Sequence, residues 1–250
     1  MTDKVVIITG GSRGIGRATA IAAATRGFKV VVGYVSNKAA ADDVVAAIEA
    51  KSGKAIAVKC DVGKESDILK LFEAADKFGT LGALINNAGT VGKSGVRVDE
   101  MSAERIQEMM AVNVTGSILC AREAVKRMST RHGGKGGAIV NLSSAAATLG
   151  SPGEYVWYAA SKAAIDGLTY GLGREVAQEG VRVNAVQPGM IDTEIHALST
   201  GDAARVERIR PTIPMQRIGT ADEVAEAVLF LMSPAASYIT ATILRVSGGR

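Results

Sequence analysis

Short apolar runs alternate with longer amphipathic stretches along almost all of this 250-residue chain. Near-continuous runs of β-branched and aliphatic residues are typical of strands in a parallel sheet that is covered on both faces. Such alternation of strands and helices implies parallel strands joined by right-handed crossovers. The predicted strands are Val5–Thr9, Lys29–Tyr34, Ala55–Lys59, Ala83–Asn86, Ala138–Leu142, Val181–Val186 and Ile243–Val246.

The amphipathic stretches between these strands predict the helices that would cover the sheet. No Pro/Ser-rich linker and no break in composition divides the chain. We therefore predict an α/β fold with a doubly wound, seven-stranded parallel sheet, in one domain over residues 1–250. The predicted helices are Gly16–Arg26, Ala39–Lys51, Ser66–Phe78, Ala103–Arg131, Val156–Glu179 and Asp222–Met232.

A glycine-rich turn connects the first predicted strand to the first predicted helix. It consists of Thr9, Gly10, Gly11, Ser12, Arg13, Gly14, Ile15 and Gly16. Glycines let the backbone approach a pyrophosphate, and a helix N-terminus adds unpaired N–H groups with partial positive charge. The spacing departs from the strict G-x-G-x-x-G pattern, so an ordinary turn is the alternative. Its position between strand and helix favours a dinucleotide phosphate site.

The basic residues of the chain are concentrated near its N-terminus. The whole chain has 29 basic and 25 acidic residues, a net charge of +4. No acidic residue occurs from Lys4 to Ala41, whereas the sequence beyond residue 41 is close to neutral. A site that prefers NAD places Asp or Glu on the ribose hydroxyls, about 20 residues beyond the glycine turn. That acidic residue is missing here.

Hydroxyl, amide and cationic side chains occupy the place of the missing acid. A 2′-phosphate is bound by such groups and is repelled by a carboxylate. We therefore predict NADP (NADPH) as the cofactor, with NAD less favoured. The residues expected around the 2′-phosphate are Arg13, Tyr34, Ser36, Asn37 and Lys38.

Tyr158 and Lys162 lie four residues apart, on one face of a predicted helix. Tyr34 and Lys38 have the same spacing, but Tyr34 ends a strand whereas Tyr158 opens a long helix. A buried strand ends shortly before Tyr158 in the two hydroxyls of Ser143 and Ser144. Ligands bind at this carboxyl edge of parallel sheets. The pattern indicates a polar site that combines a phenol, an ammonium and a hydroxyl.

With these motifs the sequence resembles the classical short-chain dehydrogenase/reductase family over essentially its whole length. The resemblance implies a Rossmann fold and an NADP(H)-dependent carbonyl reductase or alcohol dehydrogenase that acts on a small molecule. The matching motifs are Thr9–Gly16, Asn86-Asn87-Ala88-Gly89, Asn113, Ser144 with Tyr158 and Lys162, and Pro188-Gly189.

The resemblance also implies catalytic roles. Tyr158 would exchange a proton with the substrate oxygen, and Ser144 would polarise that oxygen, with Ser143 as the alternative. Lys162 and the charge of the oxidised nicotinamide would lower the pKa of Tyr158. Lys162 would also hold the nicotinamide ribose, and Asn113 would anchor a water that relays protons.

Further cofactor contacts follow from the same resemblance. Asp61 and Val62 would contact the adenine, and Ile191 and Thr193 would contact the carboxamide and phosphates. The segment 150–157 is about one residue longer than the family pattern, and Met190–Arg210, with His196, is the predicted substrate loop. The complete predicted cofactor set is Gly10, Ser12, Arg13, Gly14, Ile15, Gly16, Tyr34, Ser36, Asn37, Lys38, Asp61, Val62, Asn87, Ala88, Gly89, Tyr158, Lys162, Pro188, Gly189, Ile191 and Thr193.

Several narrower functions compete with a general carbonyl reductase. A 3-oxoacyl-carrier-protein reductase would need a basic patch at the pocket mouth, and a glucose-type sugar dehydrogenase is a further alternative. A non-catalytic NADP sensor would have no need of the Ser144, Tyr158 and Lys162 set. Candidates for the basic patch are Arg131, Arg205, Arg208 and Arg210.

Other partners are not expected. Ten aromatic residues without interleaved basic runs argue against nucleic acid, and no apolar run approaches the ~18 residues of a membrane helix. His132 and His196 have no ligand partners nearby in sequence, so we expect no metal. Cys60 and Cys120 suit a reducing compartment, and without a visible signal peptide we expect a cytoplasmic protein. The resemblance implies a homotetramer through helices Ala103–Arg131 and Val156–Glu179.

Overall fold

The computed structural model describes residues 4–92, 95–194 and 205–250, and within them seven parallel strands form one sheet. The strand order is β3-β2-β1-β4-β5-β6-β7, which confirms the predicted doubly wound fold. The direction in which strands are added reverses between β1 and β4. The strands are β1 (Lys4–Ile8), β2 (Lys29–Tyr34), β3 (Lys54–Lys59), β4 (Thr80–Asn86), β5 (Gly137–Leu142), β6 (Val181–Pro188) and β7 (Ile243–Val246).

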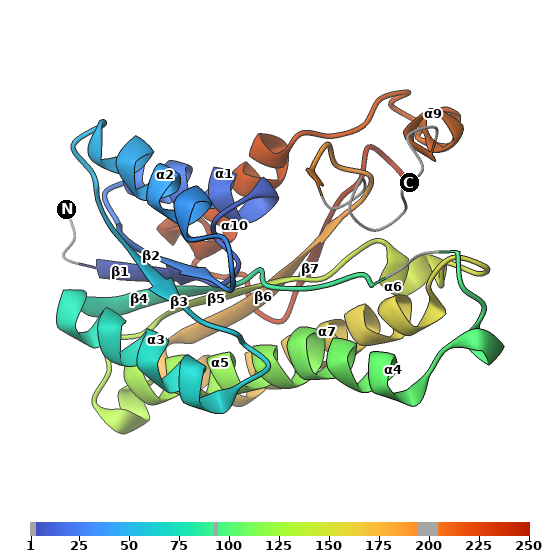
Figure 1. Cartoon of the computed structure of the whole chain (residues 1–250). Helices are drawn as coiled ribbons and strands as arrows, with labels where there is room; N and C mark the ends of the chain where they lie inside the picture. The colour runs from blue at the N-terminus through green and yellow to red at the C-terminus, as the bar shows by residue number, and fades with distance from the viewer. Residues whose placement is uncertain (1–3, 93–94, 195–204) are drawn as a thin grey trace.

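Helices cover both faces of the sheet (Figure 1). One face carries α1 (Gly14–Thr25), α2 (Lys38–Glu49) and α10 (Ala221–Met232). The opposite face carries α3 (Glu65–Phe78), α4 (Ala103–Met110), α5 (Gly116–Met128) and α7 (Val156–Glu175). The short helices α6 (Ala146–Leu149) and α9 (Arg205–Ile209) lie beyond the carboxyl ends of the strands. Short 3₁₀ turns occur at Val98–Glu100, Thr130–His132, Ala177–Glu179, Arg210–Thr212 and Pro234–Ala236.

The hydrophobic core consists of two layers, one on each side of the sheet. Successive strand residues point to opposite faces, so Ile8 packs toward α1 and α10 whereas Ile7 packs toward α3 and α5. Both side chains are fully buried. The continuous apolar runs in the sequence are therefore a consequence of a sheet that is buried on both faces.

Most predicted boundaries agree with the structure to within three residues, but the predicted helix Ala103–Arg131 is wrong as a single element. A π-helical turn, Ala111–Thr115, separates α4 from α5, and α5 ends at Met128. The predicted helix Val156–Glu179 likewise ends at Glu175 and continues as a 3₁₀ turn. None of the described helices is both long and apolar enough to cross a membrane.

Candidate active site

The carboxyl ends of β1 and β4 are held together by a buried threonine. The Thr9 hydroxyl accepts hydrogen bonds from the backbone N–H groups of Asn87 and Ala88, both at 3.0 Å. In return, Asn87 Nδ2 donates to the carbonyl oxygens of Thr9 and Gly10, both at 2.9 Å. This network fixes the glycine-rich turn at the point where the strand order reverses, which is where ligands bind in such sheets.

Two glycines of the turn, Gly10 and Gly14, have positive φ angles of 63° and 51°. A Cβ atom at Gly16 would lie 2.4 Å from the Gly10 carbonyl oxygen, so only glycine fits there. Arg13 is the N-cap residue of α1, and its side chain makes no capping hydrogen bond. The first-turn N–H groups of α1 are therefore available to an anion.

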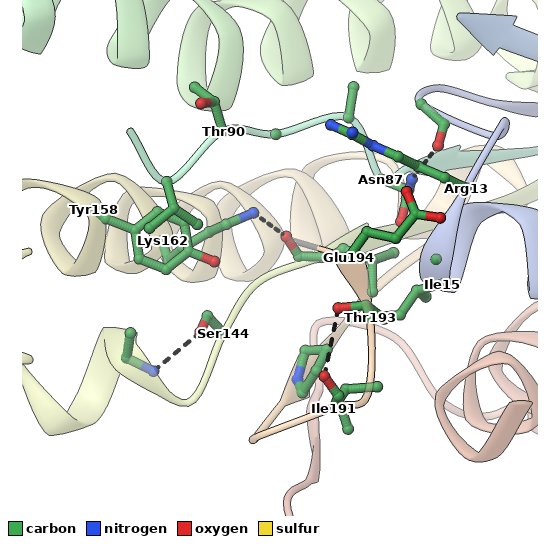
Figure 2. Close-up of a pocket in the computed structure, with 18 of the residues that line it drawn as sticks. Arg13, Ile15, Asn87, Thr90, Ser144, Tyr158, Lys162, Ile191, Thr193 and Glu194 are labelled. Carbon is green, nitrogen blue, oxygen red and sulfur yellow. Dashed lines mark hydrogen bonds between the residues drawn. The ribbon is translucent and has the colours of Figure 1, made fainter. Parts of the chain in front are cut away.

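A cavity of about 1020 Å³ extends from this turn along the carboxyl edge of the sheet to Tyr158 (Figure 2). It is lined by most of the residues that the sequence indicated, from the glycine turn, the strand ends and α7. Three predicted residues do not line it: Gly16, Lys38 and Asn113. The predicted residues in the lining are Gly10, Ser12, Arg13, Gly14, Ile15, Tyr34, Ser36, Asn37, Asp61, Val62, Asn87, Ala88, Gly89, Ser144, Tyr158, Lys162, Pro188, Gly189, Ile191 and Thr193.

At the end of the cavity beyond β2, the cationic side chains differ in their environment. Arg13 is exposed, and no partner for its guanidinium is found among the described residues. Lys38 is directed elsewhere: its ammonium pairs with Asp42 at 2.6 Å, and its side chain is 69% exposed. Arg17 and Asp43, which the sequence analysis did not single out, also line this end. Arg13 is thus the better placed cation for a bound phosphate.

At the other end of the cavity, Tyr158 and Lys162 lie one turn apart on α7. The Lys162 ammonium lies 5.7 Å from the centre of the Tyr158 ring and donates to the Leu142 carbonyl oxygen at 2.7 Å. The Ser144 hydroxyl lies beside the Tyr158 phenol, as Figure 2 shows. Ser143 has a different surrounding, because its hydroxyl donates to the Lys162 carbonyl oxygen at 3.2 Å. Both serines line the cavity, but it is Ser144 that hydrogen-bonds with the Tyr158 phenol.

Burial has the largest effect on the pKa values of Tyr158 and Lys162. It raises the pKa of Tyr158 to about 12, although the hydrogen bond with Ser144 opposes the rise. It also lowers the pKa of Lys162 to about 8, against the charge of Asp166. The expectation that Lys162 and the charge of the oxidised nicotinamide together lower the pKa of Tyr158 stays a prediction, because it concerns the site with the cofactor bound.

Asp166 lies one helical turn beyond Lys162 and was not indicated by the sequence. Its carboxylate accepts a hydrogen bond from Gln187 Nε2 at 2.6 Å. Burial raises the pKa of Asp166, and hydrogen bonds from Ser143 and Gln187 and the charges of Lys162 and Arg245 oppose that rise. The half-buried Asp166 carboxylate is thus close enough to interact with the charge of the Lys162 ammonium.

Asn113 is buried within the π-helical turn and holds the chain that follows β4. Its Nδ2 donates to the Thr90 carbonyl oxygen at 2.8 Å and to Ser161 Oγ at 3.0 Å. Its Oδ1 accepts from the Thr90 N–H at 2.8 Å. A Cβ at Gly89 would lie 3.4 Å from Asn113 Oδ1 and 3.5 Å from Lys162 Nζ. Gly89 therefore lies next to both side chains.

The substrate end of the cavity also contains residues that sequence reasoning missed. Glu154 and Tyr155 line it beside Tyr158, together with Arg205 and Ile209, which lie within the predicted substrate loop Met190–Arg210. Arg205 had been singled out only for a possible basic patch. The longer segment 150–157 and the predicted substrate loop Met190–Arg210 were the two signals that pointed to this wall. His196 lies outside the described residues, and no group of three or more potential metal ligands occurs among those described.

Comparisons with known proteins give matches over nearly the whole chain. A family model described as Enoyl-(Acyl carrier protein) reductase matches residues 10–250. Uncharacterized oxidoreductase YgfF of Escherichia coli K12 is 51% identical over 247 residues, which cover 98% of this chain and 99% of that protein. The 3-oxoacyl-(acyl-carrier-protein) reductase of Synechocystis is 40% identical over 251 residues, with coverage of 100% and 97%.

A solved structure gives a similar match. A short chain dehydrogenase from Burkholderia cenocepacia, solved in complex with NADP, is 35% identical, with a TM-score of 0.90. The match covers 99% of this chain and 98% of that one.

Proposed function

Because the chain belongs to the classical short-chain dehydrogenase/reductase family of oxidoreductases, we propose that it transfers a hydride between NADP(H) and a small-molecule carbonyl or alcohol. The observation that carries this proposal is the convergence of Ser144, Tyr158 and Lys162 at one end of the cavity that begins at the glycine turn. A nucleotide-binding protein without catalysis would not require a buried phenol, a hydroxyl and an ammonium at that end.

The residues around the cavity fit a phosphorylated dinucleotide. The close approach at Gly16, the positive φ angles in the turn and the uncapped N-terminus of α1 provide a cradle for a pyrophosphate. Ser36, Asn37 and the Arg13 guanidinium would hold a 2′-phosphate. The NADP-bound structure of the Burkholderia cenocepacia relative supports the same choice. When bound, the nicotinamide supplies or accepts the hydride.

The chain's own residues would handle the proton. With a pKa near 12, Tyr158 is a neutral phenol at neutral pH and can donate its proton to a carbonyl oxygen as negative charge develops there. Ser144, beside the phenol, would donate a hydrogen bond to the same oxygen. Oxidation of an alcohol would use the reverse transfer, with the phenolate as base.

Lys162 would stabilise that phenolate and hold the nicotinamide ribose. With a pKa near 8, Lys162 is still largely an ammonium at neutral pH. Asn113 would position the loop after β4 and keep Gly89 against Lys162. We also keep the proposal that Asn113 anchors a proton-relaying water. The direct contacts of its side chain with Thr90 and Ser161 support a positioning role.

Reduction of a 3-oxoacyl thioester is a second candidate, favoured by the Synechocystis relative. The predicted basic patch gives it little support. Arg205 pairs with Glu154 at 2.7 Å, Arg210 with Glu207 at 2.6 Å, and Arg131 lies 4.0 Å from Glu179. These arginines are engaged within the chain and do not form a set of free cations at one mouth.

The oligomeric state is a further proposal. Ile118 on α5 is 44% exposed, and Tyr170 on α7 is 43% exposed. A Cβ added at Gly167 or Gly171 of α7 would meet no atom within 4 Å. An apolar, small-residue surface on these two helices fits the proposed homotetramer, in which a single catalytic domain per chain would pack against its copies.

The experiment that tests the function is a comparison of NADPH and NADH oxidation with ketones, aldehydes, sugars and 3-oxoacyl thioesters. Turnover of a small carbonyl compound with NADPH, and less with NADH, is the expected result. Thioesters on acyl carrier protein that outperform the same acyl groups on cysteamine would establish the second candidate. NADPH binding without turnover of any compound would support a sensor instead.

A further inference from the structure

An ion pair between a buried arginine and a glutamate that is 40% exposed lies at the substrate end of the cavity. Arg205, the first residue of α9, has a side chain that is only 7% exposed. Its Nη2 donates to Glu154 Oε2 at 2.7 Å and to the Tyr155 hydroxyl at 2.6 Å. Its guanidinium carbon also lies 5.6 Å from the centre of the Tyr155 ring. We call Glu154, Tyr155 and Arg205 the clamp.

The clamp lies directly beside the proposed proton donor. The rings of Tyr155 and Tyr158 meet edge to face, with centres 5.4 Å apart and planes at 89°. All three clamp residues line the same cavity as Tyr158. The Glu154 carbonyl oxygen also accepts a hydrogen bond from the Gly95 N–H at 3.0 Å. The clamp thus joins three separate segments of the chain around the place where a substrate would lie.

The negative charge of Glu154 at this wall is paired with the positive charge of Arg205. Burial works to raise the pKa of Glu154, but the hydrogen bond and charge of Arg205 bring it below its ordinary value, with smaller help from Tyr155 and Arg250. Glu154 is therefore a carboxylate at neutral pH, and it is hydrogen-bonded to the Arg205 guanidinium. Arg205 Nη2, which could bind a substrate carboxylate, already donates to a carboxylate of the protein itself.

We infer that Glu154 sets the charge preference of the substrate pocket: by holding Arg205, it selects carbonyl compounds that are uncharged next to the carbonyl group and disfavours 2-oxo acids. A substrate carboxylate would have to displace Glu154 from the guanidinium, or lie beside it at the cost of like-charge repulsion. The Tyr155 ring, in contact with Tyr158 and with the Arg205 guanidinium, adds apolar surface to this wall of the cavity. This inference rests on the proposed carbonyl reduction for its substrates.

The kinetic test uses methyl benzoylformate and benzoylformate, which differ only in the ester. The wild-type enzyme should prefer the ester. Glu154→Gln, which keeps the side-chain shape but removes the charge, should raise the acid-to-ester ratio of kcat/KM at least about tenfold. Glu207→Gln removes the same charge from α9, the helix that carries Arg205; Glu207 pairs with Arg210 there, so the ratio should stay unchanged. Glu154→Gln combined with Arg205→Gln should lose the gain.

A fall in kcat/KM for both substrates by the same factor in Glu154→Gln would contradict the inference, because it would mean that Glu154 only supports the fold. Thermal unfolding of each variant accompanies the kinetics. If Glu154→Gln does not fold, Glu154→Ala replaces it, with the same rise in ratio expected.

A binding test separates this inference from the proposed function. Benzoate and benzamide are titrated into wild type and Glu154→Gln by calorimetry in the presence of NADP. Benzoate should bind at least about tenfold more tightly to Glu154→Gln than to wild type, with benzamide nearly unchanged. Unchanged or undetectable benzoate binding by the variant would overturn the inference. A wild type that reduces neither ester nor acid would count against the function, while the titration still decides the role of Glu154.

Discussion

Thr9 and Asn87 hold each other across the point where the strand order reverses: the Thr9 hydroxyl accepts from the Asn87 N–H, and Asn87 Nδ2 donates to the Thr9 carbonyl oxygen. The Thr9 side chain is buried, at 2% exposed, whereas Asn87 is partly buried. The pair joins the glycine turn, which would hold the phosphates, to the chain that leads toward Lys162.

Thr9→Val tests this connection because valine preserves the shape and removes the hydroxyl. The Ala88 N–H loses its acceptor, whereas the Asn87 N–H keeps the Ile85 carbonyl oxygen at 3.0 Å, so the free energy of unfolding should fall by about 1–3 kcal/mol in urea denaturation. The KM for NADPH should rise as the turn loosens. Thr25→Val is the control, since the exposed Thr25 hydroxyl donates only to the Ala22 carbonyl oxygen. Equal effects of both substitutions would show that Thr9 has no special role.

Ser144 and Ser143 offer a matched pair of alanine substitutions. Ser144→Ala should lower kcat/KM about 10²- to 10³-fold, because the hydrogen bond to the developing oxyanion is lost. Ser143→Ala should keep most of the activity and lose about 1 kcal/mol of stability, because its hydroxyl bonds the Lys162 backbone. The reverse pattern would assign the polarising role to Ser143.

The cofactor preference should depend on Arg13 far more than on Lys38. Arg13→Ala should reduce kcat/KM for NADPH about 10- to 100-fold and leave NADH nearly unchanged, since only NADPH carries the 2′-phosphate. Lys38→Ala should have little effect, because the Lys38 ammonium is exposed and paired with Asp42. Equal losses with NADPH and NADH in Arg13→Ala would place the arginine elsewhere on the cofactor.

The buried Lys162 predicts how stability changes with pH. Its pKa is about 8 in the folded protein against 10.5 for an ordinary lysine, so the unfolded chain binds more protons between these values. Stability contributed at this site must therefore rise as pH increases from 8 toward 10.5, by up to about 3 kcal/mol in total. The free energy of unfolding of wild type minus that of Lys162→Met, measured by urea denaturation from pH 7.5 to 9.5, should increase. A flat or falling difference would contradict the assigned direction.

The sequence was sufficient to predict the sheet because burial on both faces leaves a continuous apolar pattern. β4 begins three residues earlier than predicted, since Thr80 and Gly82 do not belong to such a pattern. Thr80 nevertheless pairs with Lys4, and Gly82 lies at an irregularity in the register with β1. The break between α4 and α5 was also missed. One π-helical turn leaves the amphipathic pattern almost intact, yet it contains Asn113.

The position of the cavity could be predicted where backbone motifs form it. The ion pairs of long side chains around the cavity could be predicted less well. The glycine turn and the Tyr158–Lys162 spacing indicated the cavity correctly. Lys38 pairs with Asp42, which lies four residues later on α2; this spacing is visible in the sequence, but the prediction weighed only the 2′-phosphate as a partner for Lys38. Arg205 and Glu154 are 51 positions apart, so only the fold reveals that they form a pair.

The most direct test of the proposed function is NADPH oxidation by Tyr158→Phe, with the best carbonyl substrate of the wild-type panel. Loss of the proton donor should lower kcat about 10³-fold, while the dissociation constant for NADPH, measured by fluorescence, stays within about threefold. Tyr170→Phe, on the exposed side of the same helix, should match wild type. Retention of more than a tenth of wild-type kcat by Tyr158→Phe would contradict the account.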